Sequence, residues 1–140
     1  MIYVDTSVLA AYYCPEPASD RAQRALSLEA ERAVSLLVDV ELASALAGKV
    51  RGRQIRRTDA RRILTLYQSH LEQGIYTRLP IEDAHYAQAR EWLTTFAVAL
   101  RSLDALHVAV AGLSGCSLLT ADRALARACS AVGVVARLIT

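Results

Sequence analysis

The sequence predicts a three-layer α/β/α domain with a central parallel sheet, and two observations support this prediction. Short apolar segments alternate along the chain with longer segments of helical periodicity. Each short segment is mostly apolar, without a strict alternation of apolar and polar residues, which is typical of strands covered on both faces of a parallel sheet. With 140 residues, 54% of them hydrophobic, residues 1–140 have the size and apolar content of a single domain.

Five segments are predicted to form strands because they are short, apolar and bounded by turn residues or carboxylates. Asp5 directly follows the first of them, Pro80 stops the third, and Gly115 precedes the fourth. Two of them lead straight into helix-forming sequence, which indicates strand–turn–helix units. In chain order, the predicted strands are residues 2–4, 33–38, 75–79, 117–119 and 134–139.

The predicted helices show apolar residues at helical spacing and residues that favour helix ends. Ser7 is a suitable N-cap for the first helix, and Gly52 and Gly74 mark the ends of two later ones. The helix that starts at Leu103 is apolar almost all round, so we expect it to be buried. In chain order, the predicted helices are residues 8–13, 18–31, 41–47, 58–71, 82–96, 103–113 and 123–132.

Cysteine content and hydropathy exclude several classes of protein. Cys14, Cys116 and Cys129 are too few and too scattered for a disulfide framework, and we expect them to be small core residues in a reducing compartment. The carboxylate of Asp5 interrupts the N-terminal segment before a signal peptide could develop. The uncharged stretch 105–121 contains polar residues and glycines, unlike a membrane span. We therefore expect a cytoplasmic protein without a membrane segment.

Basic residues gather in one segment although the net charge is only +2. Between Lys49 and Arg62 the chain carries seven basic residues against one acid, Asp59. Such a segment can contact phosphates or can simply form a solvated helix face, and both interpretations stay open. The residues proposed for RNA binding are Arg53, Arg56, Arg57, Arg61 and Arg62.

Four carboxylates fall where a parallel α/β sheet places its ligands, at the carboxyl ends of strands. Asp5 directly follows the first strand, Glu41 lies shortly after the second, and Asp122 follows the fourth. Asp104 begins the most apolar helix, where an uncompensated charge is costly. Each acid alone could cap a helix, but capping explains the whole set poorly. Several carboxylates held together repel one another, so a shared cation is the simplest explanation.

Hard oxygen ligands without a thiolate or imidazole cluster indicate Mg²⁺ or Mn²⁺ rather than zinc. Such ions suit the in-line hydrolysis of phosphodiester bonds. Asp39 is too close to Glu41 in sequence for both to face the same site on one helix, so we expect Asp39 to cap the helix from just before its start. His107 could reach a metal or a phosphate, but in so apolar a helix we expect a packed neutral histidine.

The motifs around these acids resemble those of the PIN-domain family, and within it the short toxin ribonucleases called VapC. The resemblance covers essentially the whole chain. Four blocks occur in the family's order and approximate spacing: residues 2–9 (IYVDTSVL), 40–42 (VEL), 101–107 (RSLDALH) and 118–125 (LLTADRAL).

The resemblance implies a magnesium-dependent endoribonuclease, the toxin of a type II toxin–antitoxin pair, with catalytic and metal-binding roles for Asp5, Glu41, Asp104 and Asp122. It places Ser7 and Thr120 as polar residues that form hydrogen bonds within the cluster, and Arg101 as a basic residue beside it. Members of this kind usually form homodimers and are neutralised by a small antitoxin whose tail covers the acidic groove.

Two alternatives remain open from the sequence. A haloacid-dehalogenase-like phosphatase would use Asp5 as a nucleophile, but it needs a second aspartate at the position of Ser7 and a later lysine, whereas Lys49 is the only lysine in the chain. A PIN-like module that binds RNA or a protein without cutting it is the second alternative. The complete set of acids speaks against this alternative.

Overall fold

Five parallel strands form the central sheet of the computed structural model, which describes residues 1–140. The strand order is β3-β2-β1-β4-β5, so β1 lies at the centre with Tyr3 opposite Ala33 on one side and Leu118 on the other. Both predictions, a parallel sheet and an α/β class, are confirmed. The strands are β1 (Ile2–Val4), β2 (Arg32–Val34), β3 (Thr77–Arg78), β4 (Ser117–Thr120) and β5 (Ala136–Leu138).

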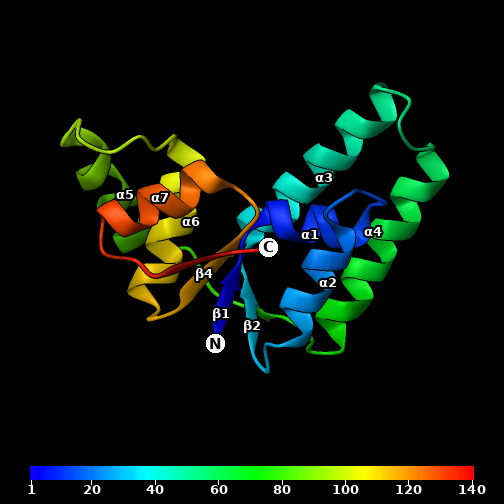
Figure 1. Ribbon diagram of the computed structural model, residues 1–140, viewed down its shortest axis with the longest axis horizontal. Helices are drawn as coiled ribbons and strands as arrows, with labels where there is room; N and C mark the ends of the chain where they lie inside the picture. Colours follow the sequence, from blue (N-terminus) through cyan, green and yellow to red (C-terminus); the bar gives the residue numbers. More distant parts are fainter.

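Seven helices cover the sheet in two layers. Helices α1 to α4 lie on one side of the strands and α5 to α7 on the other (Figure 1). The most apolar helix, α6, is buried along most of its length, as its sequence predicts. The helices are α1 (Thr6–Tyr13), α2 (Ser19–Ser27), α3 (Leu36–Arg51), α4 (Arg57–Glu72), α5 (Asp83–Thr94), α6 (Ser102–Leu113) and α7 (Arg123–Ala131).

Helices α3 and α4 form a hairpin that projects from the sheet (Figure 1). Gly52 caps the end of α3, and the turn that follows includes Arg53 with a positive φ of 58°. At the start of α4, the Asp59 carboxylate accepts a hydrogen bond from the backbone N–H of Arg56, which satisfies a donor at the helix end. The hairpin therefore carries the basic segment at its outer end.

The second strand is shorter than predicted, because the helix after it begins earlier. The apolar run was assigned to a strand over residues 33–38, whereas β2 ends at Val34 and α3 begins at Leu36, with Ser35 as its N-cap. Apart from Ser35, residues 33–38 are apolar, and such a run does not distinguish a buried strand from the first turn of a partly buried helix. In this first turn Val38 is buried and Leu36 is exposed.

The core lies between the sheet and both helical layers. Tyr3 and Val4 of β1 and Leu118 of β4 are completely buried. The three cysteines are buried and unpaired, as expected from their scattered positions. None of the helices has both the length and the apolar character needed to span a membrane.

Candidate active site

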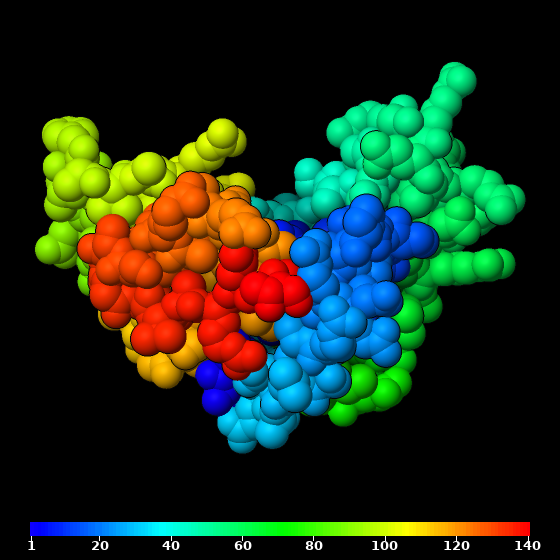
Figure 2. Space-filling view, viewed as in Figure 1, coloured from blue at the N-terminus to red at the C-terminus, as the bar shows by residue number.

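The four acids singled out in the sequence meet at the carboxyl edge of the sheet. Asp5 follows β1, Asp122 follows β4 after one intervening residue, Glu41 lies in the second turn of α3, and Asp104 lies in the first turn of α6. A pocket of about 570 Å³ is lined by Glu41, Asp104 and Asp122 together with residues 99–103. Figure 2 shows the molecule hollowed between the α3–α4 hairpin and the segment that leads into α6.

Asp5, and not Ser7 as predicted, occupies the N-cap position of α1, because the helix begins at Thr6, but Asp5 does not use its side chain as a cap. Its Oδ2 atom accepts hydrogen bonds from the Ser7 hydroxyl at 2.5 Å and the Thr120 hydroxyl at 2.9 Å. No protein donor binds Oδ1, and the ring nitrogen Nε2 of His107 lies 4.0 Å away from it. The carboxylate is thus fixed through one oxygen, while the other remains free to bind a ligand.

Glu41, like Asp5, forms hydrogen bonds with the protein through only one of its carboxylate oxygens. Its Oε1 atom accepts hydrogen bonds from the Thr6 hydroxyl at 2.9 Å and from Nε2 of the buried His107, and no protein donor binds Oε2. Burial raises the pKa of Glu41, but the hydrogen bond and electrostatic attraction of His107, together with the Thr6 hydrogen bond, outweigh this effect. The pKa therefore lies below its ordinary value, and the carboxylate is ionised at neutral pH.

Asp104 has neither a hydrogen-bond donor nor a salt-bridge partner in the protein. Burial raises its pKa, the negative charges of Asp5, Asp122 and Glu41 raise it further, and His107 only partly opposes them. A half-buried carboxylate with three acidic neighbours is in an electrostatically unfavourable place unless a cation joins it. This is the clearest electrostatic feature of the site.

Asp122 does serve as a helix cap. Its Oδ1 atom accepts hydrogen bonds from the backbone N–H groups of Ala124 at 2.7 Å and Leu125 at 3.1 Å, at the start of α7. The capping alternative is therefore confirmed for this one acid. Because both bonds use Oδ1, the second oxygen of the exposed carboxylate is available toward the pocket it lines.

Ser7 and Thr120 link the two strand ends. Besides binding Asp5, the Ser7 hydroxyl accepts a hydrogen bond from the backbone N–H of Ala121 at 3.0 Å, and the Thr120 hydroxyl accepts one from that of Asp122 at 3.0 Å. The loop after β4 is thereby fastened to the start of α1. Arg101, the N-cap of α6, is exposed and lines the acidic pocket.

The prediction for Asp39 is wrong. Asp39 does not precede the helix as a cap but lies within the first turn of α3, because the helix begins at Leu36. Its carboxylate accepts a hydrogen bond from the Tyr67 hydroxyl at 2.8 Å and forms an ion pair with Arg78. The expected divergence of Asp39 and Glu41 is nevertheless observed, because the two side chains contact different parts of the molecule.

His107 is packed within the core, as expected, but it also belongs to the site. It is completely buried and binds Glu41 through Nε2 and the Tyr3 hydroxyl through Nδ1, the latter at 2.7 Å. Sequence reasoning missed Tyr3, Thr6 and Ser35 as neighbours of the acids. The available signal was Tyr3 itself, because a tyrosine in a central strand needs a buried partner for its hydroxyl.

The structure does not bring the basic segment into the acidic pocket. All five arginines proposed for RNA binding are exposed, and none of them lines that pocket. Instead they surround the turn at the outer end of the α3–α4 hairpin. These residues are Arg53, Arg56, Arg57, Arg61 and Arg62.

The donor chemistry of the site suits a hard divalent cation. One carboxylate oxygen each of Asp5, Glu41 and Asp122 is free of protein donors, and Asp104 has no protein partner for either oxygen. In the geometry observed here, no three His, Cys, Asp or Glu side chains form a group that could hold a metal ion. The residues therefore fit Mg²⁺ or Mn²⁺ by ligand type, and their side chains would have to converge further to coordinate one.

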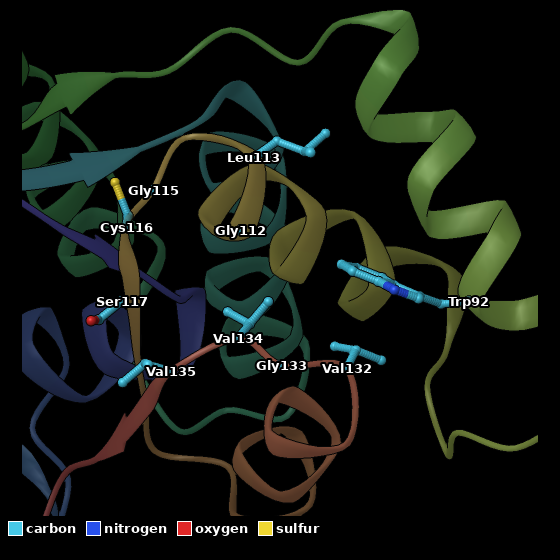
Figure 3. Close-up of a pocket in the computed structure, with 10 residues that line it drawn as sticks. All are labelled: Trp92, Gly112, Leu113, Gly115, Cys116, Ser117, Val132, Gly133, Val134 and Val135. Carbon is cyan, nitrogen blue, oxygen red and sulfur yellow. The ribbon is translucent and has the colours of Figure 1, made fainter.

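A second pocket of about 380 Å³ lies elsewhere on the molecule and contains no acid. Figure 3 shows that Leu113 at the end of α6, Cys116 and Ser117 at the start of β4, Val134 before β5 and Trp92 of α5 line it. Since these residues precede β4 and β5 rather than follow them, this pocket opens near the amino edge of the sheet. The acidic pocket is therefore the better candidate for chemistry.

The parallel sheet and the carboxylates at its carboxyl edge together define an α/β protein with an acidic site. A family model described as PIN domain matches residues 2–131, and the chain belongs to the PIN-domain family. This membership and the fold confirm the resemblance seen in the sequence motifs. No curated protein matches the sequence significantly.

Solved toxin–antitoxin proteins share the fold. VapC20 of Mycobacterium tuberculosis, described as a sarcin–ricin-loop-cleaving toxin, is 22% identical, with a TM-score of 0.72 over 96% of this chain and 97% of that one. VapBC2 of Rickettsia felis, bound to a promoter DNA fragment, is 17% identical, with a TM-score of 0.74 over the full length of both chains. FitAcB of Neisseria gonorrhoeae is 20% identical, with a TM-score of 0.69 over 97% and 96% of the two chains.

Proposed function

We propose that this protein is a magnesium-dependent endoribonuclease and the toxin of a toxin–antitoxin pair. The observation that carries the proposal is the arrangement of the acids. Asp5 and Glu41 each give one oxygen to the protein and keep one free, beside Asp104, whose charge no protein group neutralises. Family membership and the shared fold of toxins, one of them described as cleaving the sarcin–ricin loop, support the same function.

Asp5, Glu41, Asp104 and Asp122 would hold Mg²⁺ or Mn²⁺ through their free oxygens. When bound, such a cation activates water for attack on a phosphodiester and stabilises the leaving oxygen. The residues of the chain perform the positioning: Ser7 and Thr120 fix Asp5, Thr6 and His107 fix Glu41, and the backbone of α7 fixes Asp122. Arg101 at the pocket rim is suited to bind a phosphate oxygen of the RNA.

The partners follow from the same proposal. We expect RNA as substrate, an antitoxin that covers the acidic pocket, and a homodimer. A phosphatase of the haloacid-dehalogenase kind loses its support, because the chain is a PIN-domain protein with Ser7 where that enzyme requires a second aspartate. A PIN-like module that binds RNA without cutting it remains the alternative to be tested.

The test is to incubate the purified protein with total cellular RNA and Mg²⁺ and to map the new RNA ends. We expect cleavage at defined positions that stops in excess chelator and returns with Mg²⁺ or Mn²⁺ but need not return with zinc. The matched control is Asp83→Asn, which removes an exposed first-turn acid from α5 that does not line the pocket. RNA binding without new ends would favour the non-catalytic module, and full cleavage in chelator would overturn the metal mechanism.

A further inference from the structure

A line of buried hydrogen bonds leads from the end of β2 to Glu41. The Ser35 hydroxyl lies 2.7 Å from the Tyr3 hydroxyl, which lies 2.7 Å from His107 Nδ1, and His107 Nε2 contacts Glu41 Oε1. Ser35, Tyr3 and His107 are all completely buried. Residues from β1, α6 and the start of α3 thus converge on one carboxylate oxygen of the proposed cation site.

The hydrogen bonds of this line have a defined direction when His107 is neutral. Because an ionised carboxylate only accepts, His107 must donate from Nε2 to Glu41, which leaves Nδ1 as an acceptor. The Tyr3 hydroxyl then donates to Nδ1, and the Ser35 hydroxyl donates to Tyr3. The tyrosine therefore selects the tautomer in which His107 can bind Glu41.

The side chain of Ser35 takes part in this line of hydrogen bonds and does not cap α3. It is the N-cap of α3 and has extended backbone angles, yet its side chain accepts no hydrogen bond from the helix. A serine at this position ordinarily caps the first turn. Here the hydroxyl contacts Tyr3 instead, which indicates that the link to Tyr3 and His107 is a specific feature rather than a by-product of capping.

The line also determines which oxygen of Glu41 is free. His107 and Thr6 both bind Oε1, and neither binds Oε2. We propose that Ser35, Tyr3 and His107 are positioning residues that hold Glu41 by Oε1 and so present Oε2 to a divalent cation. This inference rests on the proposed function, because Ser35, Tyr3 and His107 can position a metal ligand only if Glu41 binds a metal.

The chain contains a matched control for this arrangement. The Tyr13 hydroxyl lies 2.6 Å from His70 Nδ1, another contact between a buried tyrosine and a histidine ring. This pair joins α1 to α4 and touches none of the four acids. Tyr3→Phe and Tyr13→Phe therefore each remove one hydroxyl from a tyrosine–histidine bond, but only the first of these bonds leads to Glu41.

The experiment measures Mn²⁺ binding to the full chain by calorimetry or electron paramagnetic resonance, together with melting curves, for the wild type and both variants. We expect both variants to melt lower than the wild type. Tyr3→Phe should also weaken Mn²⁺ binding by about 10-fold, as changes behind metal ligands commonly do, whereas Tyr13→Phe should leave it unchanged. Equal Mn²⁺ affinity of the two variants, or tighter binding by Tyr3→Phe, would overturn the inference.

A second pair of variants addresses His107 directly. His107→Gln keeps a side-chain N–H that can reach Oε1, whereas His107→Leu keeps similar bulk without a donor. We expect His107→Gln to bind Mn²⁺ more tightly than His107→Leu, which a purely structural role would not produce. If the wild type binds no Mn²⁺, the metal site of the proposed function fails and this inference fails with it. If the wild type binds Mn²⁺ but all positioning variants match it, only this inference fails.

Discussion

Asp39 and Glu41 lie two residues apart on α3, and their carboxylates contact opposite parts of the protein. Asp39 binds Tyr67 of α4 and Arg78 of β3, whereas Glu41 binds Thr6 of α1 and His107 of α6. Residues two apart on a helix point roughly 200° away from each other. The N-terminal part of α3 therefore binds α4 and β3 through Asp39 on one side and supplies a candidate metal ligand, Glu41, on the other.

This relationship predicts that the two acids have separable roles. Asp39→Ala leaves the buried Tyr67 hydroxyl without its acceptor, which should lower the free energy of unfolding by about 2 kcal/mol and leave RNA cleavage largely intact. Glu41→Gln should abolish cleavage and also lower the free energy of unfolding at neutral pH, because the lowered pKa of Glu41 means that its charge stabilises the folded protein. Urea unfolding curves and a cleavage assay test both variants. An Asp39→Ala protein that is folded but as inactive as Glu41→Gln would contradict the assignment.

The raised pKa of Asp104 predicts an unusual dependence of stability on pH. A carboxyl whose pKa is higher in the folded state contributes its stability below the unfolded pKa, which is about 4, and loses it as the pH rises. Without metal, Asp104→Asn should therefore be more stable than the wild type at pH 7, by about 1 kcal/mol. The difference should disappear toward pH 3, and melting curves across this range without metal measure it.

The control for this prediction is Asp83→Asn, which also removes a first-turn acid but from an exposed position on α5. A structural acid interacts favourably with the helix dipole, so this variant should be slightly less stable than the wild type at neutral pH. If Asp104→Asn behaves like Asp83→Asn, Asp104 is an ordinary helix-terminal residue.

Mg²⁺ should stabilise the wild type, because a cation that binds the folded cluster shifts the folding equilibrium by mass action. At a concentration 100 times the dissociation constant the gain is about 2.7 kcal/mol. We expect Asp104→Asn to lose most of this gain together with RNA cleavage, while RNA binding survives. A full gain in the variant, measured by melting with and without Mg²⁺, would remove Asp104 from the metal site.

Asp122 is expected to have two roles that substitution can separate. Asn at this position can still accept the hydrogen bonds from Ala124 and Leu125, whereas Ala cannot. Asp122→Ala should therefore be less stable than Asp122→Asn by about 1 kcal/mol. Both variants should lose cleavage because both lack the charge. Cleavage by Asp122→Asn at the wild-type rate would show that Asp122 acts only as a cap.

The basic segment predicts a change in the salt dependence of RNA binding. Replacing Arg53, Arg57, Arg61 and Arg62 by Gln should weaken binding across RNA sequences and flatten the slope of affinity against salt concentration. Arg56 is left in place because its guanidinium lies 3.6 Å from the carboxylate of Asp59, which caps the start of α4. The control replaces four other exposed arginines: Arg21, Arg24, Arg90 and Arg127. Equal slopes for the two variants would indicate a solvated face or a surface for a protein partner.

Much of the fold could be predicted from the sequence because local sequence patterns indicate it. Short apolar segments alternating with helices specify a parallel sheet, and the order of all five strands and seven helices along the chain was predicted correctly. The boundary between β2 and α3 was not predicted correctly, because the residues on both sides of it within 33–38 are apolar. Because of that error, Asp39 was predicted to precede the helix rather than to lie in its first turn.

The sequence by itself determined which acids lie at the candidate site, because the carboxyl ends of parallel strands meet at one edge wherever the strands lie in the sheet. Tertiary structure alone decided how those acids are held. His107 looked like a core residue in an apolar helix, and only the three-dimensional arrangement of α6, β1 and α3 places its ring between Tyr3 and Glu41. His107 lies 66 positions from Glu41 and 104 positions from Tyr3 in the sequence. Hydrogen bonds between residues so far apart depend on the three-dimensional path of the chain, and no local sequence pattern indicates them.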